Sequence, residues 1–315
     1  MKLQQLRYAL AVYRQNLNVS DAADVLFTSQ PGVSKQIRLL EEELGVPIFV
    51  RHGKRIASVT EPGKILLDTA AQILRNVDRM KHISAEFADQ TAGKLTIAAL
   101  PAIASIGLIQ TITEFLNQYQ SVELIVLTAN ESVLNQMVLD SEVDFAIGMK
   151  PTSAYPELCR LRCPNLDYEY RLIAPLDSTC PNPPSLKDIS QYSLIADSFA
   201  FCDGSPIKQA FEQAHLPLPR TALTSDDSNM IKNCVKQGFG LGLLPAAALF
   251  NNDEKELMYL DTKHLFASAF PHVILRKDNY LRGFVYAFLL LLDSSFTRER
   301  IDEALYTAVV EDFSI

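Results

Sequence analysis

The sequence predicts an α/β protein in three parts: a small helical N-terminal domain with a β-hairpin, one long helix, and a two-lobed α/β domain. Three patterns support this prediction. Apolar residues recur at helical spacing in three short segments of residues 1–60. A heptad repeat then runs from Leu66 to Phe87. Beyond residue 93, strand-like and helix-like segments alternate, which indicates mainly parallel sheet, and the length of this part favours two lobes.

The composition indicates a soluble, cytoplasmic, globular protein. Of the 315 residues, 48% are hydrophobic, which is enough for sizeable cores. No apolar run reaches the roughly 18 residues that a membrane span needs, and the N-terminus lacks the apolar core of a signal peptide. The five cysteines do not show the paired spacing of a zinc site, so we expect neither a metal nor a disulfide framework.

Charge is distributed unevenly along the chain. Residues 1–60 hold eight Lys and Arg against five Asp and Glu, a balance of +3 that leaves −11 for the rest of a chain whose total is −8. We call residues 1–60 the head. Because the head is basic and the rest of the chain is acidic, we expect that only the head contacts a polyanion.

The N-terminal domain shows clear helix boundaries. We expect its helices at Gln4–Gln15, Ser20–Leu26 and Ser29–Gly45. Ser20 is the expected N-cap of the second helix and Ser29 that of the third. Pro31 suits the first turn of the third helix because its missing N–H would be unpaired there, and Gly45 ends that helix. Residues 46–50 and 56–59 are strand-like, and the basic segment 51–55 joins them as a hairpin.

A long helix of about 28 residues is expected to begin near Thr60–Gly63. Its apolar residues follow alternating steps of four and three, the pattern of a coiled-coil seam. The seam residues are Leu66, Ala70, Ile73, Val77, Met80 and Phe87. A seam this narrow favours a partner helix, so we interpret it as a homodimerisation surface. The alternative is a long core helix of the same domain.

The alternating segments define the C-terminal domain. The expected strands are Leu95–Ala99, Glu123–Thr128, Val143–Ile147, Glu169–Ala174, Ser193–Ala196, Ala222–Leu223, Gly240–Leu244 and His272–Leu275. The expected helices are Ile103–Tyr119, Ser132–Leu139, Ser205–Ala214, Ser228–Lys236 and Leu281–Leu292. We place the domain boundaries at residues 1–60, 61–92 and 93–315.

The stretch TSQPGVSKQIRLLEEELG gives the third helix a small polar and basic face. Two short helices joined by a tight turn form a helix-turn-helix, whose second helix reads the major groove with its N-terminal residues. Gln30 can form two hydrogen bonds with adenine, Lys35 can reach guanine, and Ser34 can bond to either kind of base edge. Pro31 offers an apolar contact to a thymine methyl group. The alternative is a helix whose polar face is merely solvated.

Further residues of the head suit the DNA backbone. In the helix-turn-helix they are Thr28, Ser29 and Arg38, and in the hairpin they are Arg51, Lys54 and Arg55. A basic hairpin tip can follow the phosphates or enter the minor groove. The sequence therefore predicts a DNA-binding head.

Two segments closely resemble the N-terminal domain of LysR-type transcriptional regulators, namely NVSDAADVLFTSQPGVSKQIRLLEEELGVPIF and VTEPG. The resemblance implies a winged helix-turn-helix, a dimerising linker helix and an effector-binding domain like type II periplasmic binding proteins. It implies a regulator without a cofactor that binds operator DNA and a small-molecule effector, forms dimers or tetramers, and contacts RNA polymerase if it is an activator. The words MKLQQLRY, DFAI and NYLRGFVYAF are similar to the branch of cysteine-biosynthesis regulators, which implies control of sulfur or related metabolism.

An effector site is expected where the strands of the α/β domain end, because ligands of such domains bind at the carboxyl ends of strands and at helix N-termini. The candidate residues are Leu100, Pro101, Ala102, Ile103, Ser132, Met149, Ser198, Phe199, Phe201, Cys202 and Ser225.

The character of these loops predicts the class of effector. Helix N-termini near Ser105, Ser132 and Ser205 favour an anionic group. The apolar residues around them favour a ligand with a polar or anionic head and an apolar tail over bare sulfate. In the branch that the chain resembles, the matching loops carry threonines and a glutamine, and here most of the hydroxyls are absent. The alternative is a site that has become structural or unliganded.

No segment predicts an enzyme. Gly238–Gly242 resembles a phosphate-binding loop only superficially, since no Lys-Ser or Lys-Thr pair follows it. The five histidines are scattered, and Gly204–Pro206 is not a nucleophile elbow. The alternative function is a solute-binding or enzymatic α/β protein with an incidental helical N-terminal domain.

Overall fold

The computed structural model of the chain describes residues 1–53, 55–149, 155–166, 168–202, 204–249, 255–277 and 279–306. The chain divides into two compact units, Met1–Phe87 and Ala88–Ile315. Among the described residues, no helix has both the length and the apolar character needed to cross a membrane.

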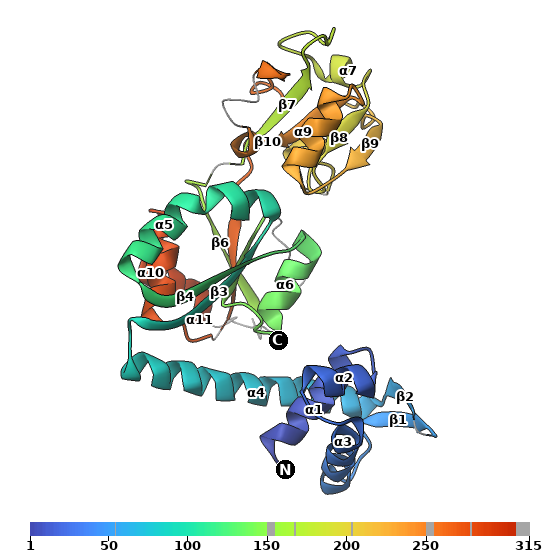
Figure 1. The fold of residues 1–315 in the computed structure, drawn as a ribbon, viewed down its shortest axis with the longest axis vertical. Coiled ribbons are helices and arrows are strands. Elements are labelled where there is room, and N and C mark those ends of the chain that lie inside the picture. The colour runs from blue at the N-terminus through green and yellow to red at the C-terminus, as the bar shows by residue number, and fades with distance from the viewer. Residues whose placement is uncertain are drawn as a thin grey trace, which may run out of the picture. The chain divides into compact units, whose positions relative to one another are not determined.

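The N-terminal unit consists of short helices, a hairpin and a long helix (Figure 1). Its elements are α1 (Leu3–Arg14), α2 (Val19–Val25), α3 (Gln30–Leu44), β1 (Phe49–His52), β2 (Arg55–Val59) and α4 (Glu61–Ala88). The two strands of the hairpin pair antiparallel. The helices, the hairpin and the long helix expected from the sequence are therefore all present.

One buried cluster joins the elements of this unit. Its main members are Leu6, Ala9, Val12, Ala22, Ala23, Val33, Ile37, Leu40, Ile48, Phe49, Leu67 and Ala70. Burying this apolar surface is the main stabilising contribution to so small a domain. Because the inward residues of α3 recur at steps of three and four, the polar residues of that helix remain on its outer face.

Local hydrogen bonds fix the helix ends. The N-cap of α2 is Asn18, whose Oδ1 accepts from the backbone N–H groups of Ser20 at 3.0 Å and Asp21 at 3.4 Å. The assignment of Ser20 as N-cap was wrong, because an Asn two residues earlier satisfies the same group of unpaired N–H donors. Helix α3 begins as expected with Ser29 as N-cap and ends at Gly45, which has a φ of +72°.

The predicted seam of α4 lies in two environments. At its N-terminal end, Ala70 is 5% exposed and belongs to the buried cluster of its own unit, and Leu66 and Ile73 pack partly against that cluster. Ala70 is therefore a core residue rather than a partner contact, since the first turns of α4 cover the helix-turn-helix. Farther along the helix, Met80 is 69% and Phe87 is 84% exposed.

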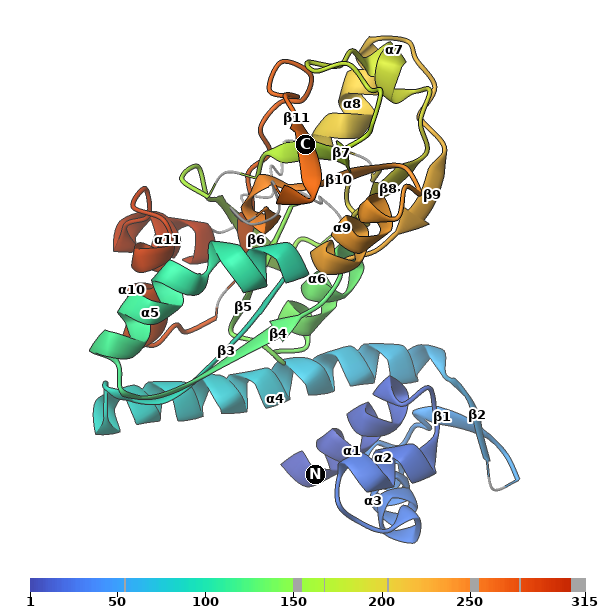
Figure 2. The same ribbon diagram turned by 45° about the horizontal axis from the view of Figure 1, so that its top comes forward.

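The C-terminal unit contains two sheets, each of five strands within the described part of the chain (Figures 1 and 2). The first sheet, in the order β4-β3-β5-β12-β6, comprises β3 (Ala92–Ala99), β4 (Ser121–Thr128), β5 (Phe145–Gly148), β6 (Leu158–Arg162) and β12 (His272–Arg276). The second, in the order β11-β7-β10-β8-β9, comprises β7 (Tyr170–Pro175), β8 (Leu194–Ala196), β9 (Thr221–Thr224), β10 (Leu241–Pro245) and β11 (Leu257–Leu260).

Each sheet is half parallel and half antiparallel. Strands β4, β3 and β5 are parallel in the first sheet, and β10, β8 and β9 are parallel in the second. The chain passes from β6 into β7 and returns from β11 into β12, and each antiparallel pair contains β7 or β12. The expectation of mainly parallel sheet is corrected accordingly, because strands that enter from the other lobe need no helical crossover.

Helices flank both sheets. They are α5 (Ile109–Gln118), α6 (Glu131–Leu139), α7 (Leu186–Ile189), α8 (Pro206–Gln213), α9 (Ser228–Lys236), α10 (Gly283–Leu292) and α11 (Arg298–Tyr306). The single helix expected over Ile103–Tyr119 is divided into a π-helical turn at Ile103–Gly107 and α5. The sequence reasoning missed β6, β11, α7 and α11, which are short or lie near the C-terminal end of the described chain.

Candidate DNA-binding surface and effector site

The outer face of α3 carries most of the predicted base-reading residues. Gln30, Pro31, Lys35 and Arg38 are exposed, and Thr28 and Ser34 are partly buried. On the opposite side of the helix, Val33 and Ile37 are both 0% exposed. One face of the helix is therefore packed into the core and the other is exposed, which is the arrangement predicted for a helix that reads the major groove.

The residues predicted to contact the DNA backbone include Ser29 at the start of α3 and Arg55 in the hairpin. Ser29 is exposed, and its Oγ accepts from Gly32 N at 3.3 Å, which leaves its hydrogen available to donate to a phosphate. Arg55 in the hairpin is exposed, and Lys54 lies outside the described residues.

Glu41 connects α3 to the hairpin, a role that the sequence did not reveal. Its Oε1 accepts two backbone N–H groups at the start of β1, at 2.9 and 3.0 Å. Its Oε2 accepts from Arg51 Nη2 at 3.2 Å, and the Glu41 side chain is only 12% exposed. Arg51 is therefore partly engaged within the protein and is less available to phosphates than predicted.

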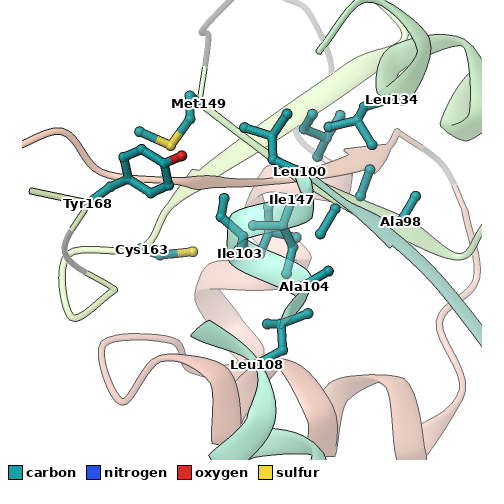
Figure 3. Packing of buried hydrophobic residues seen from close by; sticks show 14 of the residues in the cluster. Ala98, Leu100, Ile103, Ala104, Leu108, Leu134, Ile147, Met149, Cys163 and Tyr168 are labelled. Carbon is teal, nitrogen blue, oxygen red and sulfur yellow. The ribbon is translucent and has the colours of Figure 1, made fainter. Parts of the chain in front are cut away.

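The predicted effector residues follow the carboxyl ends of β3, β4 and β5 in the first sheet and of β8 and β9 in the second. The larger apolar ones, Leu100, Ile103, Met149 and Phe199, are only 3% to 7% exposed. Figure 3 shows the first three in one buried cluster with Tyr168 and Cys163. These side chains belong to the buried core of the unit, and their role in binding an effector stays a prediction.

The remaining candidate residues are more accessible. Pro101, Ala102, Phe201 and Ser225 are partly buried, and Ser132, Ser198 and Cys202 are exposed. The more accessible candidates are thus small or polar, apart from Phe201, and the other large apolar candidates are buried.

The N-terminus of α6 already holds a carboxylate of the chain itself. Glu131 is the first residue of this helix, and its Oε2 accepts from the backbone N–H of Met149 at 2.9 Å. A Cβ on Gly148 would lie 2.8 Å from each Glu131 carboxylate oxygen, so the glycine lets this carboxylate approach the end of β5. Asn130 Oδ1 caps the helix and accepts from Ser132 Oγ at 2.7 Å. Acceptors of the protein therefore occupy the places expected for an anionic effector group.

A second internal carboxylate lies at the end of β8. Asp197 accepts from Tyr170 Oη at 2.8 Å, from Tyr168 Oη at 3.3 Å and from Ala200 N at 2.8 Å. Burial raises the pKa of Asp197 to about 6, although these three hydrogen bonds lower it. Burial also raises the pKa values of both tyrosines well above the usual value, so both remain donors.

Tyr168 links this cluster to the chain segments between the sheets. It lies between β6 and β7 and forms an isolated antiparallel bridge with Ala269, which lies between β11 and β12. Its hydroxyl therefore ties the two connecting segments to the end of β8. The sequence reasoning named neither Tyr168 nor Asp197, and the only local signal was an Asp directly after the buried segment Leu194–Ala196.

Other hydroxyl groups near the strand ends of both sheets are also engaged. Ser198 donates from its Oγ and its backbone N–H to Asp226 Oδ1. Ser205 Oγ donates to Ala200 O and caps α8. Ser105 Oγ donates to Pro101 O at 2.8 Å. At two of the helix N-termini expected to favour an anion, a side chain of the protein caps one backbone N–H group, and Ser105 lies in the π-helical turn rather than at the start of α5.

Metal and thiol chemistry find no support in the described residues. No group of three or more His, Cys, Asp or Glu side chains there is arranged to hold a metal ion. The five cysteines are free thiols. Burial raises the pKa of the Cys159 thiol to about 11 and that of Cys163 to about 12, which makes both unreactive at neutral pH.

Two protein families match the chain, one for each part of this geometry. Residues 3–64 match the family described as "Bacterial regulatory helix-turn-helix protein, lysR family". Residues 88–297 match the family described as "LysR substrate binding domain". The two matches together cover the DNA-binding head and most of the C-terminal unit.

Curated relatives match over nearly the whole chain. The regulator CysB of Burkholderia cenocepacia is 37% identical over 97% of each chain, and SsuR of the same organism is 33% identical over 98% of this chain and 100% of that protein. The regulator Cbl of Escherichia coli is 32% identical over 99% of this chain and 98% of that protein.

Solved structures match as well. The cofactor-binding domain of Cbl aligns with a TM-score of 0.63 and 27% identity, covering 68% of this chain and 94% of that one. Full-length CbnR in complex with its target DNA aligns with a TM-score of 0.61 and 19% identity, covering 94% of this chain and 100% of that one. At that level of identity the second match bears on the fold alone.

Proposed function

Because the chain belongs to the LysR family of bacterial transcriptional regulators, which are DNA-binding proteins and not enzymes, we propose that it reads an operator through α3 and reports a small-molecule effector bound near the strand ends of its C-terminal unit. The observation that carries the DNA-reading part is the division of α3, with Val33 and Ile37 buried on one side and Gln30, Lys35 and Arg38 exposed on the other.

We assign separate roles to the predicted DNA-binding residues of the head. Gln30 and Lys35 read base edges in the major groove, with Ser34 and Pro31 contributing at the same positions. Thr28, Ser29, Arg38 and Arg55 hold the phosphates, and we assign the same role to Arg51 and to Lys54, which lies outside the described residues. Such a division predicts that the two sets respond differently to a change of DNA sequence and to salt.

The regulated genes belong, in this proposal, to sulfur or related metabolism. Support comes from the shared sequence with CysB, SsuR and Cbl over nearly the full length of all three proteins. The protein acts as a homodimer through the exposed part of α4 and contacts RNA polymerase if it activates transcription. Support for the dimer is the exposed apolar residues Met80 and Phe87 on the heptad positions of a solvent-facing helix.

The effector that the structure supports best is not a bare, strongly hydrated anion such as sulfate. Glu131 accepts the Met149 N–H and Asp197 accepts the Ala200 N–H, so the chain's own carboxylates take the donors that an anion would use. A further anion there would meet like charge. We therefore favour a polar but uncharged or amine-bearing effector over sulfate, which revises the anionic head expected from the sequence.

Selection of duplexes from a random pool by the full-length protein tests the DNA-reading proposal. The expected result is enrichment of a sequence with two related half-sites, because a dimer presents two copies of α3. We refer to the enriched product as the selected duplex. A protein of the alternative class, a solute-binding protein with an incidental helical head, would enrich no sequence.

A further inference from the structure

Phe27 occupies the turn between α2 and α3 in a backbone conformation that suits glycine. Its N–H donates to Asp24 O at 3.1 Å, and the next N–H, of Thr28, donates to Ala23 O at 2.9 Å. This pair of bonds is the Schellman motif that ends many helices, and it requires a left-handed residue between them. Phe27 has a φ of +49°. A bulky side chain in this region is strained, whereas glycine is not.

The ring of Phe27 gains nothing from the protein in return for this strain. It is 98% exposed, the largest exposure among the large apolar side chains of the described residues. Leu17 offers the comparison, since it also has a left-handed φ, of +67°, but packs partly against the buried cluster of its unit. Core packing thus accounts for the side chain of Leu17 and does not account for that of Phe27.

The position of Phe27 points to DNA as the missing contact. The residue directly precedes Thr28 and Ser29, and Ser29 is the N-cap of the helix that presents Gln30. In helix-turn-helix proteins the N-terminal end of the second helix lies against the duplex, and the turn before it lies at the rim of the major groove. An exposed ring at that rim would face the deoxyribose groups of a bound duplex.

We propose that Phe27 is a DNA-contacting residue whose ring packs against the sugar groups at the rim of the major groove and so positions α3. A contact of this kind is apolar. It strengthens binding to any sequence, and it releases no counterion, because no phosphate is neutralised. Loss of the ring therefore lowers affinity on all duplexes and leaves the salt dependence of binding unchanged.

The substitution Phe27→Gly separates this role from a structural one. Glycine relieves the left-handed strain, so the midpoint of thermal unfolding should stay the same or rise by a few degrees. Binding should weaken about tenfold on both the selected duplex and a shuffled duplex of the same composition, the effect of losing roughly half of the apolar area of a Phe. Fluorescence anisotropy of the full-length protein at several salt concentrations measures the affinity and the salt slope together.

Two further variants serve as controls. Phe27→Leu keeps an apolar side chain and should retain most of the affinity. Phe239→Ala removes another exposed ring, 64% exposed in the C-terminal unit, and should leave DNA binding unchanged. Unchanged affinity in Phe27→Gly would overturn the proposal, as would a lower unfolding midpoint accompanying the loss of affinity. A shallower salt slope would also overturn it, because that result assigns the contact to phosphate.

Discussion

Polar side chains are exposed on the outer face of α3, whereas at the strand ends of the C-terminal unit they are hydrogen-bonded within the protein. On α3, Gln30, Lys35 and Arg38 are exposed, and the helix is held by its buried side alone. At the strand ends, Glu131 and Asp197 are bonded to neighbouring backbone and side-chain donors. The exposed donor side chains of the first surface suit the proposed contact with DNA. The second is already satisfied from within, so a ligand there must replace or extend existing hydrogen bonds.

This contrast indicates different selectivity at the two surfaces. An exposed set of donors binds any polyanion weakly and one base sequence strongly, because phosphate contacts add affinity and base contacts add discrimination. A site whose N–H donors are occupied by internal carboxylates discriminates against anions before any ligand arrives. Four predictions test the contrast.

The largest effect is expected from the element that pairs two copies of the DNA-binding face. Val77 lies on a heptad position of α4, beyond the part that packs on the helix-turn-helix. Val77→Asp places a charge in the proposed dimer seam, where an unpaired charge is costly. Loss of the dimer removes the second half-site contact, so affinity for the selected duplex should fall by about 100-fold or more. Sedimentation and anisotropy measure the two effects together.

Gln72→Asp provides the matched control for the seam. Gln72 is exposed and lies off the heptad positions, so the same charge there should leave both the dimer and the affinity intact. If Val77→Asp binds the selected duplex as the unmodified protein does, the exposed part of α4 is not the dimer surface.

The second prediction concerns the internal carboxylate at the end of β8. Burial raises the pKa of Asp197 to about 6, so the folded state holds this proton more tightly than the unfolded chain, whose Asp pKa is near 3.8. The stabilisation is therefore fully present below about pH 4 and is lost as the pH rises through about 6. The shift corresponds to about 3 kcal/mol of unfolding free energy.

Urea unfolding between pH 4 and pH 7, followed by the fluorescence of the 11 tyrosines in this Trp-free chain, measures the effect. Asp197→Asn should remove this component of the pH dependence, and Asp177→Asn, at an exposed position, should not. Equal pH profiles for Asp197→Asn and the unmodified protein would contradict the assignment.

The sequence predicts the head better than the strand ends, because the head is determined by local patterns and the strand ends by contacts between distant residues. The head follows from local patterns: Ser29 and Gly45 mark the ends of α3, and the spacing of Val33 and Ile37 gives its buried face. These signals are local because a helix closes its hydrogen bonds within four residues. The long helix follows for the same reason, from its heptad repeat.

The strand ends depend on contacts between distant residues, which no local pattern encodes. Asp197 meets Tyr170 from 27 positions away, and the Met149 N–H meets Glu131 from 18. The sequence placed Met149 at the correct strand end, but whether it lines a cavity or fills the core depends on packing across the whole unit. The reversed strands of each sheet escaped prediction because direction depends on how the chain crosses between the two lobes.

The third prediction tests base reading on α3. Gln30→Ala should cost about 1–3 kcal/mol on the selected duplex, the value of one two-bond contact to a base, and much less on the shuffled duplex. Lys35→Ala should behave similarly, whereas Arg38→Ala should weaken binding to both duplexes and reduce the salt slope by about one unit. Equal losses on both duplexes for Gln30→Ala would move Gln30 from the base-reading set to the backbone set.

The smallest effect is expected at the N-terminus of α6, where the Glu131 carboxylate accepts the N–H group that an anionic effector could use. Sulfate should bind the unmodified full-length protein weakly or not at all, because the Met149 N–H is occupied and a second negative charge would approach the first. Glu131→Gln keeps an acceptor for that N–H and removes only the charge, so sulfate affinity should rise about tenfold at low ionic strength. Glu142→Gln makes the same change of charge at an exposed position after α6 and should have no effect.

Calorimetric titration with sodium sulfate measures the affinity of all three proteins. Tight binding of sulfate by the unmodified protein would show that the Glu131 carboxylate moves away when an anion binds. The proposed contrast between exposed donors on α3 and internally bonded donors at the strand ends would then be wrong.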